Sequence, residues 1–175
     1  MSTITPLQAI RLTHNVLLKQ LITKGRLIGI TIIGLLPILL GWVIGRQSDD
    51  PLEAGVGFVS YMGLSILIPI VALIFASASL GDTREDGTLV YLWLRPISRL
   101  SVSTGAWAAS ITIALPLTAI PMTISAILLD AGNSVITATI ITSILAVVAY
   151  SGLFVTLGLI VKNPVLWGLA YIFIW

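Results

Sequence analysis

Six charged side chains lie within residues 82–99 of a chain in which only 9% of residues are charged. They are Asp82, Arg84, Glu85, Asp86, Arg95 and Arg99. Paired carboxylates can transfer protons in catalysis, whereas mixed acidic and basic side chains can steer the docking of another protein. A plain solvated loop would also accept this composition. The rest of the sequence has to decide among a catalytic site, a docking surface and a loop.

Few other residues could carry out catalysis. The chain has no cysteine, which excludes disulfides, thiolate metal sites and cysteine nucleophiles. Its single histidine, His14, cannot form a metal site alone, and a serine hydrolase needs a histidine or an equivalent base beside the serine. No GxxxxGK[ST] loop is present to hold ATP in the P-loop manner. We therefore expect this chain to be no enzyme and to hold no cofactor of its own.

Composition places the chain in the membrane class. It is 57% hydrophobic, with a mean hydropathy of +1.09 over 175 residues. Most of this apolar surface must face membrane lipids. The net charge of +2 is too small to indicate a nucleic-acid partner.

Four apolar runs are each long enough to cross a hydrocarbon core of about 30 Å. They are residues 27–45, 56–80, 102–129 and 135–161. A fifth run starts at Val165 after a Lys-Asn-Pro loop and would reach only about 16 Å, so we expect the chain to be a fragment of a longer protein. The sequence predicts an all-α, polytopic membrane helical bundle with its transmembrane domain at 27–175.

Residues 1–26 predict a separate amphipathic helix. Thr5 suits the N-cap and Pro6 the first helical position. Arg11, Asn15 and Lys19 recur four residues apart on a polar face. A basic amphipathic helix before a span is typical of an interfacial helix on the cytoplasmic membrane surface. The alternative is an ordinary extension of the first span.

The distribution of Lys and Arg predicts the orientation. Only Arg46 lies between the first and second spans, while the other eight basic residues fall on the opposite side. These eight are Arg11, Lys19, Lys24, Arg26, Arg84, Arg95, Arg99 and Lys162. The positive-inside rule then places the N-terminus and residues 82–99 in the cytoplasm. We expect a multi-pass protein of the cell membrane, in a prokaryotic plasma membrane.

Within residues 82–99, glycines and a proline mark the breaks. Gly81 and Gly87 are natural helix breakers, and the stretch between them could form a single helical turn with Asp82 near its N-cap. An apolar, aromatic-rich stretch follows at 88–94. Pro96 then disfavours helical geometry at Arg95 and marks a turn before the third span.

This segment resembles the connection between the second and third spans in permeases of the type-two exporter class of ATP-binding-cassette (ABC) transporters. The matching elements are Arg84-Glu85-Asp86, Gly87-Thr88-Leu89, an apolar run through Leu94, and Pro96-Ile97-Ser98-Arg99. Asp86 stands where that family often has an arginine or another polar residue. The family also has six spans, which is more than this chain contains.

The resemblance implies a coupling loop at 82–99 that docks on a separate ATPase subunit, where ATP and Mg²⁺ would bind. Charged contacts would come from Arg84 and Glu85, and Gly87 would set a turn. The residues implied in docking are Asp82, Arg84, Glu85, Asp86, Gly87, Thr88 and Leu89, and those implied at the start of the third span are Pro96, Ser98 and Arg99. A second permease copy, or a homologous permease, would complete the membrane part.

Two alternatives stay open. The first is a secondary carrier or channel that works without ATP and uses hydroxyl-bearing helices. No charged residue lies in the middle of a span, which disfavours a proton-coupled carrier. The hydroxyls available in the second and third spans include Ser60, Ser65, Ser77, Thr112, Thr118, Thr123 and Ser125. The second alternative is a membrane scaffold whose charged loop recruits some other protein.

Overall fold

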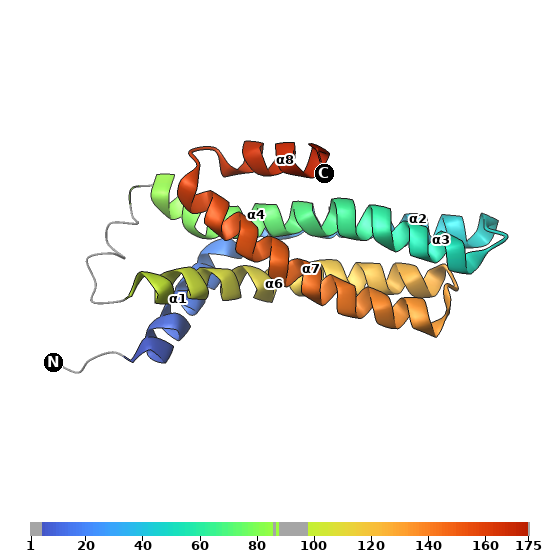
Figure 1. The fold of residues 1–175 in the computed structure, drawn as a ribbon, viewed down its shortest axis with the longest axis horizontal. Helices are drawn as coiled ribbons and strands as arrows, with labels where there is room; N and C mark the ends of the chain where they lie inside the picture. Colours follow the sequence, from blue (N-terminus) through green and yellow to red (C-terminus); the bar gives the residue numbers. More distant parts are fainter. Residues whose placement is uncertain (1–4, 86, 88–97, 175) are drawn as a thin grey trace.

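A computed structural model describes residues 5–85, 87 and 98–174, with side chains described for all of these except 82–85. The described residues form helices and no strand, which confirms the predicted all-α class (Figure 1). The helices are α1 (Pro6–Leu21), α2 (Lys24–Gln47), α3 (Pro51–Phe58), η1 (Val59–Leu67), α4 (Ile68–Glu85), α6 (Arg99–Leu128), α7 (Gly132–Ile160) and α8 (Pro164–Ile174).

Four stretches of helix are long and apolar enough to cross a membrane. They are α2, the continuous run of α3, η1 and α4, and then α6 and α7, which all extend along the long axis of the molecule in Figure 1. The expected spans coincide with these helices to within a few residues. Pro164 begins α8, as predicted, and α8 contacts α4 and α7.

The second span contains an irregularity that apolar periodicity does not predict. Val59–Leu67 is π-helical, and the Ser65 hydroxyl donates to the carbonyl of Ser60, five residues earlier, at 3.1 Å. A π-helix has one more residue per hydrogen-bonded ring than an α-helix, so it rotates the side chains that follow it. The faces of α4 are therefore not those that a continuous α-helix from Pro51 would present.

The N-terminal segment folds as a helix of its own. Thr5 caps α1 by accepting from the Gln8 amide, and the Thr5 amide donates to the side-chain oxygen of Gln8, which completes a capping box. The two residues at 22–23 separate α1 from α2, so the alternative of a simple extension of the first span is wrong. In Figure 1, α1 crosses one end of the bundle obliquely. Its position on a membrane surface stays a prediction.

A seam of small residues attaches α1 to the beginning of α6. Ala9, Thr13 and Leu17 are buried at spacings of four residues. A Cβ atom placed on Gly105 of α6 would lie only 2.8 Å from the Thr13 Cβ atom and 3.1 Å from the Ile10 carbonyl oxygen. The glycine is thus what allows the two backbones to approach so closely.

The central helix of the bundle is α4. It contacts α1, α6, α7 and α8, and its side chains at Val71, Ala72 and Phe75 are fully buried. Close approach to α7 depends on Gly158, because a Cβ atom there would lie 2.9 Å from the Ser77 carbonyl oxygen. The half of the second span that ends at Glu85 is therefore held on several sides by other helices.

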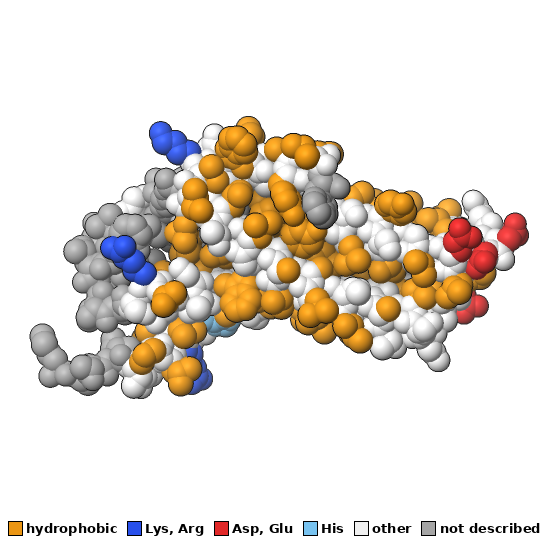
Figure 2. Space-filling model, viewed as in Figure 1, with side chains coloured by type: hydrophobic (Ala, Val, Ile, Leu, Met, Phe, Trp, Pro, Cys, Tyr) orange, Lys and Arg blue, Asp and Glu red, His pale blue; other side chains and the backbone are white. Residues whose placement is uncertain are grey.

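Charged side chains gather at the two ends of the bundle and leave the middle apolar (Figure 2). One end carries basic residues of α1, α2, α6 and the α7–α8 loop, and the other carries acidic residues of the α2–α3 and α6–α7 loops. Asp50 caps α3 by accepting hydrogen bonds from the amides of Leu52 and Glu53, each at 3.1 Å. Arg46, the one basic residue at the acidic end, lies over the Trp42 ring at 4.1 Å.

The contact of Gly158 with α4 leads to a stability prediction. Replacing Gly158 by Ala should lower the free energy of unfolding by about 1–3 kcal/mol, because the added methyl meets a backbone carbonyl that cannot rotate away. Gly57→Ala is the matched control, since no atom lies within 4 Å of a Cβ at that position. Thermal unfolding of the purified variants in detergent measures both. Equal melting temperatures for the two variants would show that α4 and α7 are less tightly packed than described.

The separation of charge predicts which loops face the cytoplasm. Because the chain lacks cysteine, single cysteines at Asn163 and Asn133 report the basic and the acidic end, and both asparagines are exposed. We expect a membrane-impermeant maleimide added to intact cells to label Asn133→Cys and to spare Asn163→Cys until the cells are lysed. The reverse labelling pattern would place the basic end outside.

Candidate functional site

The segment predicted to dock on a partner joins α4 to α6 at the basic end of the bundle (Figure 1). Its first four residues, at 82–85, continue α4 as its last turn. The expected separate turn with Asp82 near an N-cap is therefore wrong, and Gly81 does not break the helix. Gly81 is buried beside Pro164 of α8, and such tertiary packing outweighs the cost of about 1 kcal/mol for glycine inside a helix.

Gly87 adopts the backbone conformation that a turn requires. Its φ of +67° lies in the left-handed region, which glycine adopts without penalty, and the residue is exposed. A left-handed glycine just after a helix end is a common way to stop a helix. This conformation agrees with a turn at Gly87, while the part of Gly87 in docking on a partner stays a prediction.

Ser98 stands immediately before α6 and caps it. Its side-chain oxygen accepts a hydrogen bond from the Ser101 amide at 3.1 Å and lies 2.7 Å from the Ser101 hydroxyl oxygen. Its φ and ψ of −67° and 143° are those of an N-cap residue. Arg99 follows as the first residue of α6. The cap therefore fixes where α6 begins.

Several predicted site residues lie outside the described residues or are described by their backbone alone. Asp86, Thr88, Leu89 and Pro96 lie outside the described residues, and only the backbone is described at Asp82, Arg84 and Glu85. The ion pairs expected of Arg84 and Glu85 with a partner thus stay predictions. The segment is defined by its two ends, the last turn of α4 with Gly87 and the cap at Ser98.

A cavity beside the end of α4 was not expected from the sequence. It has a volume of about 520 Å³ and lies between the beginning of α2, the end of α4 and the beginning of α8. Its polar lining comes from Arg26, Ser77 and Asn163, while Ile74 and Leu169 contribute apolar surface. One indication of this cavity was present in the sequence: Arg26 and Asn163 both lie in loops or helix ends on the basic side of the predicted bundle.

The described residues offer no catalytic constellation at this end of the bundle. No group of three or more His, Asp or Glu side chains within them is arranged to hold a metal ion. His14 bonds instead to Thr112 of α6 through its Nε2 atom at 3.1 Å and to Asn15 through its Nδ1 atom at 3.2 Å. Its contacts join α1 to α6, which is a structural role.

The cap at Ser98 provides a local test. Ser98→Ala should destabilise the first turn of α6 by about 0.5–2 kcal/mol, because the Ser101 amide loses its acceptor. Hydrogen exchange of peptides covering that turn should become several-fold faster. Ser103→Ala is the control, since its hydroxyl only donates to the Arg99 carbonyl and caps no amide. Unchanged exchange in Ser98→Ala would mean that the cap does not fix the start of α6.

The site described above can be set against known proteins. No protein-family model matches the chain, and no match is found among curated proteins or among solved structures.

Proposed function

We propose that the chain is a membrane-spanning permease subunit of an ATP-driven ABC transporter, working as an exporter. Residues 82–99 form its coupling loop and dock on a separate ATPase subunit in the cytoplasm of a prokaryotic cell. ATP and Mg²⁺ bind that subunit, and this chain contributes the path through the membrane. A second permease copy, or a homologue, supplies the other half of the path.

One observation carries this proposal. The charged segment continues directly from α4, which is the most buried of the span helices. A displacement of the segment therefore acts on a helix that contacts α1, α6, α7 and α8. A solvated loop between two peripheral helices would have no such mechanical connection to the bundle.

The geometry favours transmission by rigid shifts of packed helices. Phe75 and Ala76 of α4 are fully buried, so α4 cannot slide without moving the side chains around it. At its other end the segment leads into α6 through the Ser98 cap, and α6 in turn contacts α1 and α2. Closure of the ATPase subunit would thus reach every described span through α4 and α6.

The alternative of a hydroxyl-lined carrier has weaker support. The side chains of Thr118, Thr123 and Ser125 in α6 each donate to the carbonyl four residues earlier, at 2.7–2.8 Å. Ser77 and Thr112 bond within their own helices in the same way. Hydroxyls satisfied by their own helix are less available to coordinate a solute. No observation on the described residues favours the carrier over the permease.

Substitutions at Gly87 test this proposal. Gly87→Val places a β-branched residue at a φ of +67° and should lower coupled ATPase activity about tenfold, since L-residues pay about 1–2 kcal/mol there. Gly87→Asn is the matched variant, because asparagine tolerates the left-handed region. The measurement is the ATPase activity of the complex purified from the native host through the tagged chain.

Two outcomes would contradict the proposal. If the chain moves a solute in proteoliposomes without ATP and no P-loop ATPase accompanies it, the carrier alternative replaces the proposal. If an ATPase accompanies it but Gly87→Val and Gly87→Asn both match the unmodified protein, the segment is not the coupling loop. Insertion into the membrane should be normal in both variants, because Gly87 is exposed and a Cβ atom there has no neighbour within 4 Å.

A further inference from the structure

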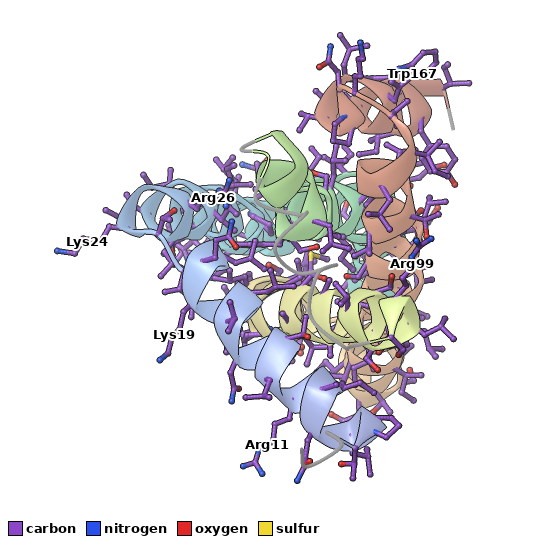
Figure 3. The ribbon with its side chains drawn as sticks, turned by 90° about the vertical axis from the view of Figure 1, so that its left-hand side faces the viewer. Arg11, Lys19, Lys24, Arg26, Arg99 and Trp167 are labelled. Carbon is purple, nitrogen blue, oxygen red and sulfur yellow. The ribbon has the colours of Figure 1, made fainter. Side chains whose placement is uncertain are left out.

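Three basic side chains form an exposed edge at the corner between α1 and α2. Arg11, Lys19 and Lys24 are all exposed, and Figure 3 shows them projecting from the same side of the molecule. Arg26 lies inward of Lys24 in that view, and Arg99 lies toward the opposite side. We call Arg11, Lys19 and Lys24 the basic edge.

The helix geometry explains why these side chains face outward together. Ala9, Thr13 and Leu17 face α6, so Arg11 and Lys19 fall on the opposite side of α1. The break at 22–23 then starts α2 at Lys24, beside the end of α1. Within the part of the chain that the structure describes, none of the three basic side chains forms an ion pair.

The surface of α2 that continues from Lys24 is apolar, and two of its residues are glycines that have no side chain to project from it. Gly25 and Gly29 have no atom within 4 Å of an added Cβ, and Ile28 and Ile32 are 61% and 59% exposed. Gly34 and Gly41, in contrast, lie against Pro121 and Ser125 of α6. The first two glycines are therefore not needed for packing inside the described bundle, and they leave a shallow strip beneath the basic edge.

We propose that the basic edge and this strip together bind a phospholipid with an anionic headgroup. The headgroup phosphate lies against the ammonium and guanidinium groups of the edge, and an acyl chain runs over Gly25 and Gly29. Charge complementarity selects this occupant, because anionic lipids attract basic residues that flank a membrane span. The apolar spans bring Lys24 to headgroup depth, since it stands one helical turn before the first apolar run.

This inference does not depend on an ATPase partner, and it gives α1 a second attachment besides α6. The seam at Gly105 holds one face of α1 to the protein, and the lipid headgroup holds the opposite face. A helix held from both sides keeps its oblique angle across the end of the bundle. The edge would thus link the composition of the membrane to the position of α6.

The test uses the full chain in vesicles containing spin-labelled phosphatidylglycerol or phosphatidylcholine. Electron spin resonance measures the relative association constant of the two lipids with the protein. We expect phosphatidylglycerol to be preferred and Lys19→Gln/Lys24→Gln to lower that preference by about fivefold for each charge removed. Arg46→Gln/Lys162→Gln removes the same charge away from the edge and should keep the preference. Lys19→Arg/Lys24→Arg should also keep it, which shows that the edge tolerates substitution.

Three results would overturn the proposal. The unmodified protein could show no preference for phosphatidylglycerol, or the two glutamine pairs could lower the preference equally, which would indicate net charge alone. Displacement of the lipid by micromolar polyglutamate peptide would assign the edge to an acidic protein partner instead. Gly25→Leu/Gly29→Leu tests the strip, and an unchanged association constant in that variant would remove the acyl-chain part of the site.

Discussion

The exclusion of charge from hydrocarbon is the constraint on which the rest of this structure depends. An ionised side chain at the centre of a bilayer costs at least about 2.5–3.5 kcal/mol, and none lies in the middle of the four long apolar helices. The charged side chains that the structure describes therefore lie at one end of the bundle or the other (Figure 2). That division creates a basic end, where the α4–α6 connection and the basic edge both lie. The same constraint thus determines where a soluble partner and where a charged lipid can approach.

Between these ends the helices are held by close contact rather than by polar bridges. Lipid tails are as apolar as the side chains of the spans, so helices gain little from burying them and depend on packing of small residues instead. Gly158 against Ser77 and Gly105 against Thr13 are contacts of this kind. Most hydroxyls donate a hydrogen bond to a carbonyl of their own helix. The Trp107 indole instead joins two helices, because it donates to the Val148 carbonyl of α7 at 3.0 Å. A bundle packed in this way transmits the displacement of one helix to its neighbours.

Local chemistry could be predicted from the sequence, and tertiary packing could not. Thr5 and Pro164 act where their side-chain chemistry indicated, because capping and helix initiation depend on a few neighbouring residues. Gly81 was expected to end a helix and does not, since its burial beside α8 is set by residues far away in the chain. The π-helical stretch at Val59–Leu67 was missed because its composition, apolar apart from Ser60, Tyr61 and Ser65, does not distinguish the two helical periods. The docking of α1 on α6 depends on Gly105, whose role appears only when the two helices meet.

The central claim is that the connection after α4 touches an ATPase subunit in the cytoplasm. The most direct measurement places the photoreactive residue p-benzoylphenylalanine at Gly87, the exposed residue that follows the last turn of α4, and irradiates intact cells. The account predicts a cross-linked product that contains a protein with a P-loop, and no such product when the same residue replaces Asn133 at the acidic end. Cross-linking at position 87 to lipid alone, or to a protein without a nucleotide-binding motif, would contradict it.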